Sequence, residues 1–319
     1  MVAGGSLRDP GAIVTTVAAL DCGTNALRIL IMRGEGDESP VEILREMRTV
    51  RLGEGVDATG ELSLAALQRT FEALDEYQEL MEEHGVERAR MVATSATRDA
   101  RNRAQFVEGV HARIGVVPEV ITGDEEAKLS FQGAVGALLP DARMPPYLVA
   151  DIGGGSTEFV RGGDHPDAWV SVDIGCVRMT ERHLHGDPPT AEEIRLAEND
   201  IAVAVAQANM RVDFGEATTF VGLAGSVTTV AAYCLDLSVY DPVVLHGSVV
   251  SREEVERATD AYLAMTRQER AALAYMHPGR VDVIAGGAMV LREIMRQGSF
   301  ERVVVSENDL LDGIAYSLL

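Results

Sequence analysis

The chain has 319 residues, of which 46% are hydrophobic and 24% charged, and its formal net charge at pH 7 is −22. This length allows two ordinary domains, each with a core of its own. General nucleic-acid binding depends on clustered Lys and Arg, so the negative charge argues against it. No apolar run reaches the length of a membrane span, and residues 1–11 hold no apolar stretch of signal-peptide length, so we expect a cytoplasmic protein.

The first 125 residues alternate between strand and helix patterns. Strands are predicted at 15–33, 41–52, 90–94 and 119–121, and helices at 62–84 and 102–114. The first strand region folds back after Asp21, and Ser63 is a candidate N-cap. This alternation indicates an α/β layer architecture.

A predicted helix over 125–139 leads into a proline-containing connection, 140–146, after which the strand pattern restarts at Tyr147. Strands are predicted at 147–151, 157–162, 168–174, 219–222 and 302–305, and helices near 190–211, 226–234, 251–265 and 281–296. We therefore expect a first lobe over 1–125 and a second over 126–305.

The segment 151–158, Asp-Ile-Gly-Gly-Gly-Ser-Thr-Glu, follows a short apolar strand. Glycines at 153, 154 and 155 let backbone N–H groups approach a phosphate, and the hydroxyls of Ser156 and Thr157 add donors. Asp151 at its head can hold a divalent cation. A glycine-rich hairpin turn without a ligand is the alternative interpretation.

The same arrangement occurs once more near the N-terminus, where a strand runs into Asp21-Cys22-Gly23-Thr24-Asn25 and a second strand follows. Two strand–Asp–Gly–hydroxyl hairpins suggest two halves that close on one phosphorylated ligand.

Two further segments follow strands and carry polar or charged groups. Residues 94–98, Thr-Ser-Ala-Thr-Arg, offer hydroxyls and the Arg98 guanidinium to a phosphoryl group, although the residues alone slightly favour a solvated loop with helix-capping hydroxyls. The helix start 123–128 carries three carboxylates, which either complement the helix dipole or include a group that activates water. Spacing alone does not decide between these interpretations.

Other residues give weaker indications. The glycines at 225, 286 and 287 lie at strand-to-helix transitions, where a helix N-terminus can receive phosphate or helices can pack closely. The three cysteines show no disulfide or zinc spacing. His183 and His185 could form a metal pair, but without a matching ligand cluster a solvated loop is the better interpretation.

Taken together, these motifs resemble the exopolyphosphatase and guanosine pentaphosphate phosphohydrolase family, within the actin-like superfold of sugar kinases and chaperone ATPases. The matching segments, in order and at family spacing, are 21–25, 93–98, 123–128, 151–158, 174–178, 224–226, 279–284 and 306–313. The resemblance implies an α/β fold of two actin-like, ribonuclease H-like lobes with the active-site cleft between them, and a C-terminal segment, 306–319, that packs back on the first lobe.

The resemblance also implies roles for individual residues. Glu126 looks like the catalytic carboxylate, assisted by Arg98. The phosphate-binding residues would be Thr24, Asn25, Gly153, Gly154, Gly155, Ser156, Thr157, Gly225, Ser226 and Arg280. The metal-associated acids would be Asp21, Asp151 and Glu158, with Mg²⁺ or Mn²⁺ as the ion.

The implied activity is removal of the terminal phosphate from inorganic polyphosphate by a homodimeric enzyme. Alternatives are hydrolysis of guanosine pentaphosphate, a sugar or acetate kinase of the same superfold, and a non-catalytic polyphosphate or nucleotide sensor. The chain departs from the family at Ala26, where Ser is usual, and at Lys128, where Arg is common. The sequence also stops where longer relatives continue into a helical C-terminal domain, so we expect a preference for short polyphosphate chains.

Overall fold

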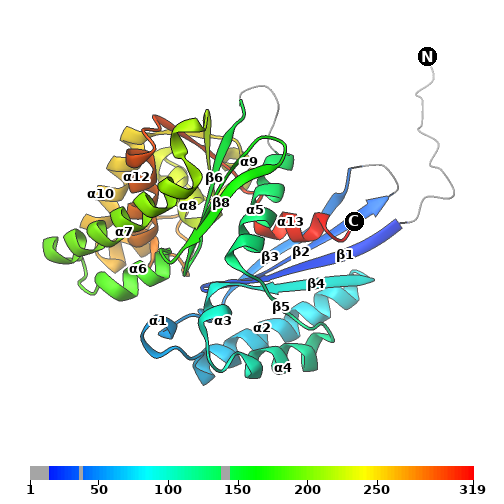
Figure 1. Cartoon of the computed structure of the whole chain (residues 1–319). Helices are drawn as coiled ribbons and strands as arrows, with labels where there is room; N and C mark the ends of the chain where they lie inside the picture. The colour runs from blue at the N-terminus through cyan, green and yellow to red at the C-terminus, as the bar shows by residue number, and fades with distance from the viewer. Residues whose placement is uncertain (1–13, 36–38, 138–143) are drawn as a thin grey trace, which may run out of the picture.

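The computed structural model describes residues 14–35, 39–137 and 144–319 and contains two β-sheets with helices around them (Figure 1). The first sheet has the order β3-β2-β1-β4-β5. Its strands are β1 (Val14–Cys22), β2 (Ala26–Glu35), β3 (Val41–Thr49), β4 (Arg88–Ala93) and β5 (Glu119–Val120). The helices of this lobe are α1 (Val56–Thr59), α2 (Leu64–Glu83), α3 (Ser95–Asp99) and α4 (Arg103–Ile114). Helices α2 and α4 cover one sheet face through a core that includes Leu74, Tyr77 and Phe106.

The second sheet has the order β10-β11-β9-β6-β7-β8. Its strands are β6 (Tyr147–Ile152), β7 (Thr157–Gly162), β8 (Pro166–Val172), β9 (Thr219–Leu223), β10 (Val249–Ser251) and β11 (Arg302–Val305). The accompanying helices are α6 (Cys176–His183), α7 (Ala191–Val212), α8 (Ala224–Cys234), α9 (Pro242–Leu245), α10 (Arg252–Ala264), α11 (Arg267–Ala271) and α12 (Ile284–Gln297). The main core of this lobe lies between the sheet and α7, α8, α10 and α12.

Both sheets are built in the same way. In each, three successive strands form an antiparallel meander, and the next strand, β4 or β9, pairs in parallel with the first, β1 or β6. The two hairpins even share their register, because Asp21 lies opposite Arg28 and Asp151 lies opposite Glu158. The two-lobed α/β architecture expected from the sequence is therefore confirmed.

Two helices lie between the sheets, α5 (Gly123–Ala137) and α13 (Leu310–Tyr316), side by side in Figure 1. Ala127 and Phe131 of α5 pack on the second sheet, whereas Leu310 and Ile314 of α13 pack on the first. We propose on this basis to keep the expected division into 1–125, 126–305 and a returning segment, 306–319.

Several boundaries differ from the sequence prediction. The strand predicted over 41–52 ends at Thr49, because the N–H groups of Val50 and Arg51 donate to Asn25 O and Arg51 has a φ of 49°. The helix predicted from 125 begins at Gly123, and its expected last residues, 138 and 139, lie outside the described residues.

The loop interpretation of His183 was wrong. His183 ends α6, and its Nε2 lies 2.9 Å from Asp200 Oδ2. The helices that were not predicted from the sequence are α1, α3, α6, α9, α11 and α13, and each has eight residues or fewer.

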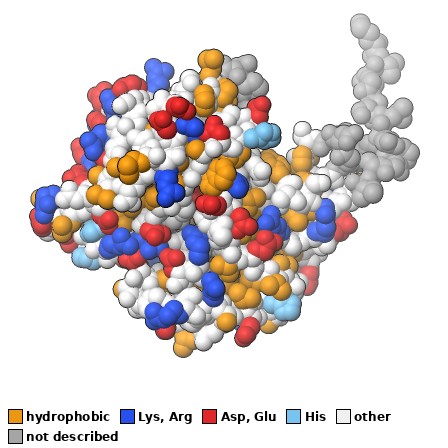
Figure 2. Space-filling model, viewed as in Figure 1, with side chains coloured by type: hydrophobic (Ala, Val, Ile, Leu, Met, Phe, Trp, Pro, Cys, Tyr) orange, Lys and Arg blue, Asp and Glu red, His pale blue; other side chains and the backbone are white. Residues whose placement is uncertain are grey.

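The described part of the chain contains no helix that is both long and apolar enough to span a membrane. In Figure 2, acidic and basic side chains are interspersed over the visible face, with no large patch of one sign. The described residues of the visible face therefore form no broad cationic surface of the kind that binds nucleic acids.

Candidate functional site

The two glycine hairpins face each other across the cleft between the lobes. Each turn is closed in the same way, by Gly23 N–H to Ala26 O at 2.9 Å and by Gly153 N–H to Ser156 O at 3.1 Å. A cavity of about 70 Å³ lies between them. The sequence-predicted residues that line it are Asp21, Thr24, Asn25, Glu126, Asp151, Gly153, Gly154, Gly155, Ser156, Gly225 and Arg280.

Four predicted site residues do not line this cavity. The Thr157 hydroxyl donates to Ile174 O, and the Ser226 hydroxyl is buried with no hydrogen-bond partner in the part of the chain that the structure describes. Glu158 is buried and accepts a 2.7 Å hydrogen bond from the Ser171 hydroxyl. Arg98 lines a different, more open cavity, and its hydrogen bond to Glu126 connects it to the first.

The loop 153–156 turns its carbonyls away from the cavity. Gly153 O accepts from Cys176 N–H, and Gly154 O accepts from the N–H groups of Val177 and Arg178, at 2.9–3.1 Å. In a planar trans peptide the next N–H points the opposite way. Among the described residues, the N–H groups of Gly154 and Gly155 have no protein acceptor, so they are free to bind an anion.

The loop also lies close to the first lobe. A Cβ on Gly155 would come within 2.5 Å of Ser95 Oγ, and one on Gly154 within 2.8 Å of Thr24 Cβ. Only glycine therefore lets the two hairpins approach so closely.

Glu126 lies in the first turn of α5 and is 7% exposed. Its Oε2 accepts a 3.1 Å hydrogen bond from Arg98 Nη1, which also donates to Ile121 O. Burial, followed by the charges of Glu158 and Asp151, raises the pKa of Glu126 well above its usual value, while Arg98 opposes this shift. A further positive charge nearby would lower the pKa of Glu126 and so favour its ionised form.

Asp21 is held by a network that the sequence analysis missed. Arg28 donates to Asp21 Oδ2 from Nε at 3.0 Å and from Nη2 at 2.7 Å, and its Nη1 bonds Asp309 Oδ2. The second oxygen, Asp21 Oδ1, is buried and has no hydrogen-bond partner within the described residues. Arg28 could have been found by counting outward from the turn, because the hairpin register places it opposite Asp21.

Asp151 occupies the equivalent position in the second lobe. Its Oδ2 accepts a 2.7 Å hydrogen bond from the Ser130 hydroxyl, another partner that the sequence did not reveal. Burial and the charges of Asp309 and Glu158 raise the pKa of Asp151 to about 7, although Ser130 and Arg28 oppose the rise. The pKa values of Glu126 and Asp151 are therefore both raised in the same buried cavity. A cation bound there would stabilise the ionised form of both groups.

The carboxylates of the cavity fit a magnesium ion only if water and substrate phosphate supply its other ligands. No group of three or more His, Cys, Asp and Glu side chains in the described residues could enclose a metal. Mg²⁺, however, usually keeps several waters and is held by one or two carboxylates together with substrate phosphates. Asp21, with its unpartnered Oδ1, and Asp151 fit that arrangement, whereas Glu158 is turned to Ser171.

Arg280 closes the cavity on the side of the second lobe. Among the described residues its guanidinium has no carboxylate partner, and a Cβ on Gly225 would overlap it. Neighbouring Ala224 has a φ of 67°, a conformation that side chains rarely adopt. The segment that carries Arg280 contacts the first lobe, because Asn25 Nδ2 donates to Gly279 O at 3.1 Å. An unpaired cation and a strained turn are features of a binding site.

Comparison with known proteins identifies relatives along almost the whole chain. The Ppx/GppA phosphatase family model matches residues 31–319. Exopolyphosphatase 2 of Mycobacterium tuberculosis is 47% identical, over 96% of this chain and 99% of that protein.

Solved structures agree with these relatives. The crystal structure of an exopolyphosphatase-like protein superposes with a TM-score of 0.91 at 42% identity, covering 95% of this chain and 98% of that chain. The PPX-GPPA enzyme of Aquifex aeolicus has a TM-score of 0.79 at 31% identity, covering 96% of this chain and all of the other. The chain therefore belongs to the Ppx/GppA phosphatase family.

Proposed function

We propose that this protein is an exopolyphosphatase, which hydrolyses the terminal phosphoanhydride bond of inorganic polyphosphate. The observation that carries the proposal is that the small cavity brings together the Glu126 carboxylate, the Arg280 guanidinium and loop amides that have no acceptor among the described residues. Amides and a guanidinium suit an oxyanion of phosphate, and a carboxylate suits a water molecule. The name and the identity of the M. tuberculosis relative support the same substrate.

Each group has a role in this proposal. The N–H groups of Gly154, Gly155 and Ser156, the Ser156 hydroxyl and Arg280 bind the terminal phosphoryl oxygens. Glu126 orients a water molecule and accepts its proton as the water oxygen attacks phosphorus, and the bond to the bridging oxygen breaks. Arg98 fixes the Glu126 carboxylate. Positioning and electrostatic stabilisation supply most of the acceleration in phosphoryl transfer.

We further propose that Asp21 and Asp151 hold a Mg²⁺ ion, which Mn²⁺ could replace. When bound, the ion neutralises charge that develops on the phosphate oxygens. Arg28 binds Asp21 Oδ2, which leaves Oδ1 without a partner among the described residues for this role, and Ser130 orients Asp151.

The test is release of orthophosphate from polyphosphates of several lengths, measured beside guanosine pentaphosphate and ATP with Mg²⁺. We expect turnover of short polyphosphate without any acceptor, which a kinase would require. Binding of polyphosphate with no release of phosphate would replace the proposal by a sensor role. A homodimer and a cytoplasmic location stay predictions that sedimentation and cell fractionation can check.

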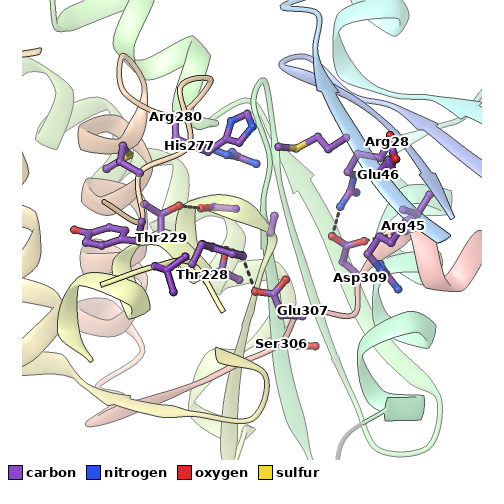
Figure 3. A pocket seen from close by; sticks show the side chains of 18 of the residues that line it. Arg28, Arg45, Glu46, Thr228, Thr229, His277, Arg280, Ser306, Glu307 and Asp309 are labelled. Carbon is purple, nitrogen blue, oxygen red and sulfur yellow. Dashed lines mark hydrogen bonds and ion pairs between the residues drawn. The ribbon is translucent and has the colours of Figure 1, made fainter. Parts of the chain in front are cut away.

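One observation favours guanosine pentaphosphate hydrolysis as a second candidate. A larger cavity of about 520 Å³ adjoins the first and shares Arg28, Gly225 and Arg280 with it. In Figure 3, His277 and Arg280 approach this cavity from one side and Arg28 and Arg45 from the other. Tyr240 and Tyr275 give it aromatic surface that suits a nucleoside beside a phosphate chain. A kcat/KM for guanosine pentaphosphate above that for tripolyphosphate would make this the main activity.

Replacement of Gly225 by Ala tests the phosphate role of Arg280. The added Cβ would overlap the guanidinium, which is the mobile end of its side chain, so Arg280 must move while the fold is kept. We expect KM for polyphosphate to rise about tenfold, as for loss of one charge-assisted hydrogen bond, with Tm nearly unchanged. Gly163→Ala is the control, because its Cβ would meet nothing closer than 3.8 Å. Equal KM values in the two variants would remove Arg280 from the site.

A further inference from the structure

Arg178, in the first turn of α6, joins the two lobes behind the phosphate cavity. Its Nε donates to Gly155 O at 2.7 Å, and its Nη2 donates to Ser95 Oγ at 3.2 Å and to Asp99 Oδ2 at 2.6 Å. Its Nη1 donates to Asp57 Oδ1 at 2.7 Å. The side chain is only 12% exposed, and its bonds to Gly155 and Ser95 are partly buried.

The partners of Arg178 come from both walls of the cavity. Gly155 belongs to the glycine loop of the second lobe, and Ser95 begins α3 of the first lobe; both line the cavity, whereas Arg178 does not. Arg178 lies instead in the tight contact behind these walls, where there is room for only about 10 Å³. It therefore contacts the groups that would touch phosphate without touching the phosphate itself.

The bond to Gly155 O has a direct consequence for the cavity. Because the peptide between Gly155 and Ser156 is planar and trans, its N–H points opposite to its carbonyl. A guanidinium that holds Gly155 O on the α6 side thus turns Ser156 N–H toward the cavity. Backbone N–H groups of α6 fix the carbonyls of Gly153 and Gly154 in the same way, so Arg178 completes the orientation of three successive peptides.

We propose that Arg178 is a positioning residue for catalysis. It orients the Gly155–Ser156 peptide toward the terminal phosphoryl group and sets the distance between the glycine loop and Ser95 across the cleft. This inference rests on the proposed hydrolysis of polyphosphate and adds to it a residue outside the cavity.

Arg178→Met tests the proposal, because Met keeps the aliphatic stem and removes every side-chain hydrogen bond of Arg178. The matched control is Arg182→Met, one turn further along α6. Arg182 also bonds Asp57, and it pairs with Asp200, but it touches neither the glycine loop nor Ser95. We expect Arg178→Met to lower kcat by about 10–100-fold, the loss that a displacement of about 1 Å can cause, and Arg182→Met to stay within about threefold.

Two more measurements separate positioning from folding. Arg178→Lys, which can reach one acceptor but cannot form the fork, should give an intermediate kcat at a Tm near that of the wild type. Asp99→Ala leaves the bond between Arg178 and Gly155 in place, so this variant alone should lower kcat only slightly. Combined with Arg178→Met, it should lower kcat no further, because Arg178 and Asp99 belong to one network.

The outcome is decisive in each case. Equal kcat values for Arg178→Met and Arg182→Met overturn the proposal, and so does a wild-type kcat in Arg178→Lys if Arg178→Met does not fold. Calorimetric binding of tripolyphosphate, weaker in Arg178→Met than in Arg182→Met, tests the orientation of the loop without hydrolysis. If the wild type released no phosphate, the proposed function would fail, yet this binding comparison would still decide the role of Arg178.

Discussion

Glu126→Gln should abolish nearly all phosphate release while leaving substrate binding intact. Gln has the same shape, and its amide oxygen can still accept the hydrogen bond of Arg98, so the local structure is kept. What is lost is the ability to accept a proton from water, which is worth about 10²–10⁴ in rate. We expect kcat to fall by about that factor and the affinity for tripolyphosphate, measured by calorimetry, to change little.

Glu125→Gln is the matched control, since it makes the same change one residue away. Glu125 is exposed, and its Oε2 accepts from the N–H and the hydroxyl of Thr122 at the start of α5, a capping role that Gln can also fill. The control should keep wild-type turnover. If Glu126→Gln retained turnover within about threefold of this control, Glu126 would not be the group that activates water.

The sequence was sufficient to predict the two lobes because the informative pattern is local. Each hairpin combines an apolar strand, an Asp, a glycine turn and a second strand, and turn closure fixes the register. Asp21 and Asp151 therefore fall at equivalent positions, and both line the cavity. The alternation of strands and helices indicated the α/β layers, and the family motifs indicated the actin-like superfold.

The orientation of individual side chains could not be predicted, because it depends on residues that are distant in the chain. Glu158 lies opposite Asp151, yet the Ser171 hydroxyl of β8 binds its carboxylate. Lys128, two residues after Glu126, places its Nζ 4.2 Å from the centre of the Trp169 ring rather than in the cavity. Charge and spacing indicate which residues are near a site, but packing decides which of them face it.

Helix α6 was missed for a related reason. Its first N–H groups are satisfied by the carbonyls of Gly153 and Gly154, which are more than twenty residues away in sequence. No capping side chain marks its start. The helix and the glycine loop thus stabilise each other, a relation that a local pattern does not contain.

Asp151→Asn should lower turnover by about 10²–10³, the cost of removing one electrostatic stabiliser of the transition state. Asn can still accept the Ser130 hydrogen bond but brings no charge to a cation. We therefore expect the Mg²⁺ concentration for half-maximal activity to rise at least about tenfold, since even indirect metal contacts are worth that much. Phosphate release over a Mg²⁺ titration measures both effects.

Stability separates this interpretation from simple damage to the fold. In EDTA, Asp151→Asn should unfold at the wild-type temperature or above, because burial and neighbouring carboxylates already raise the pKa of Asp151 to about 7 and the neutral amide avoids that cost. Mg²⁺ with tripolyphosphate should then raise the Tm of the wild type but not of the variant, since a ligand stabilises only the state that binds it. Asp260→Asn removes a charge from an exposed carboxylate that pairs with Arg292 outside the cavity, and it should behave as the wild type. A Mg²⁺-dependent rise in Tm of equal size in Asp151→Asn would exclude Asp151 as a metal ligand.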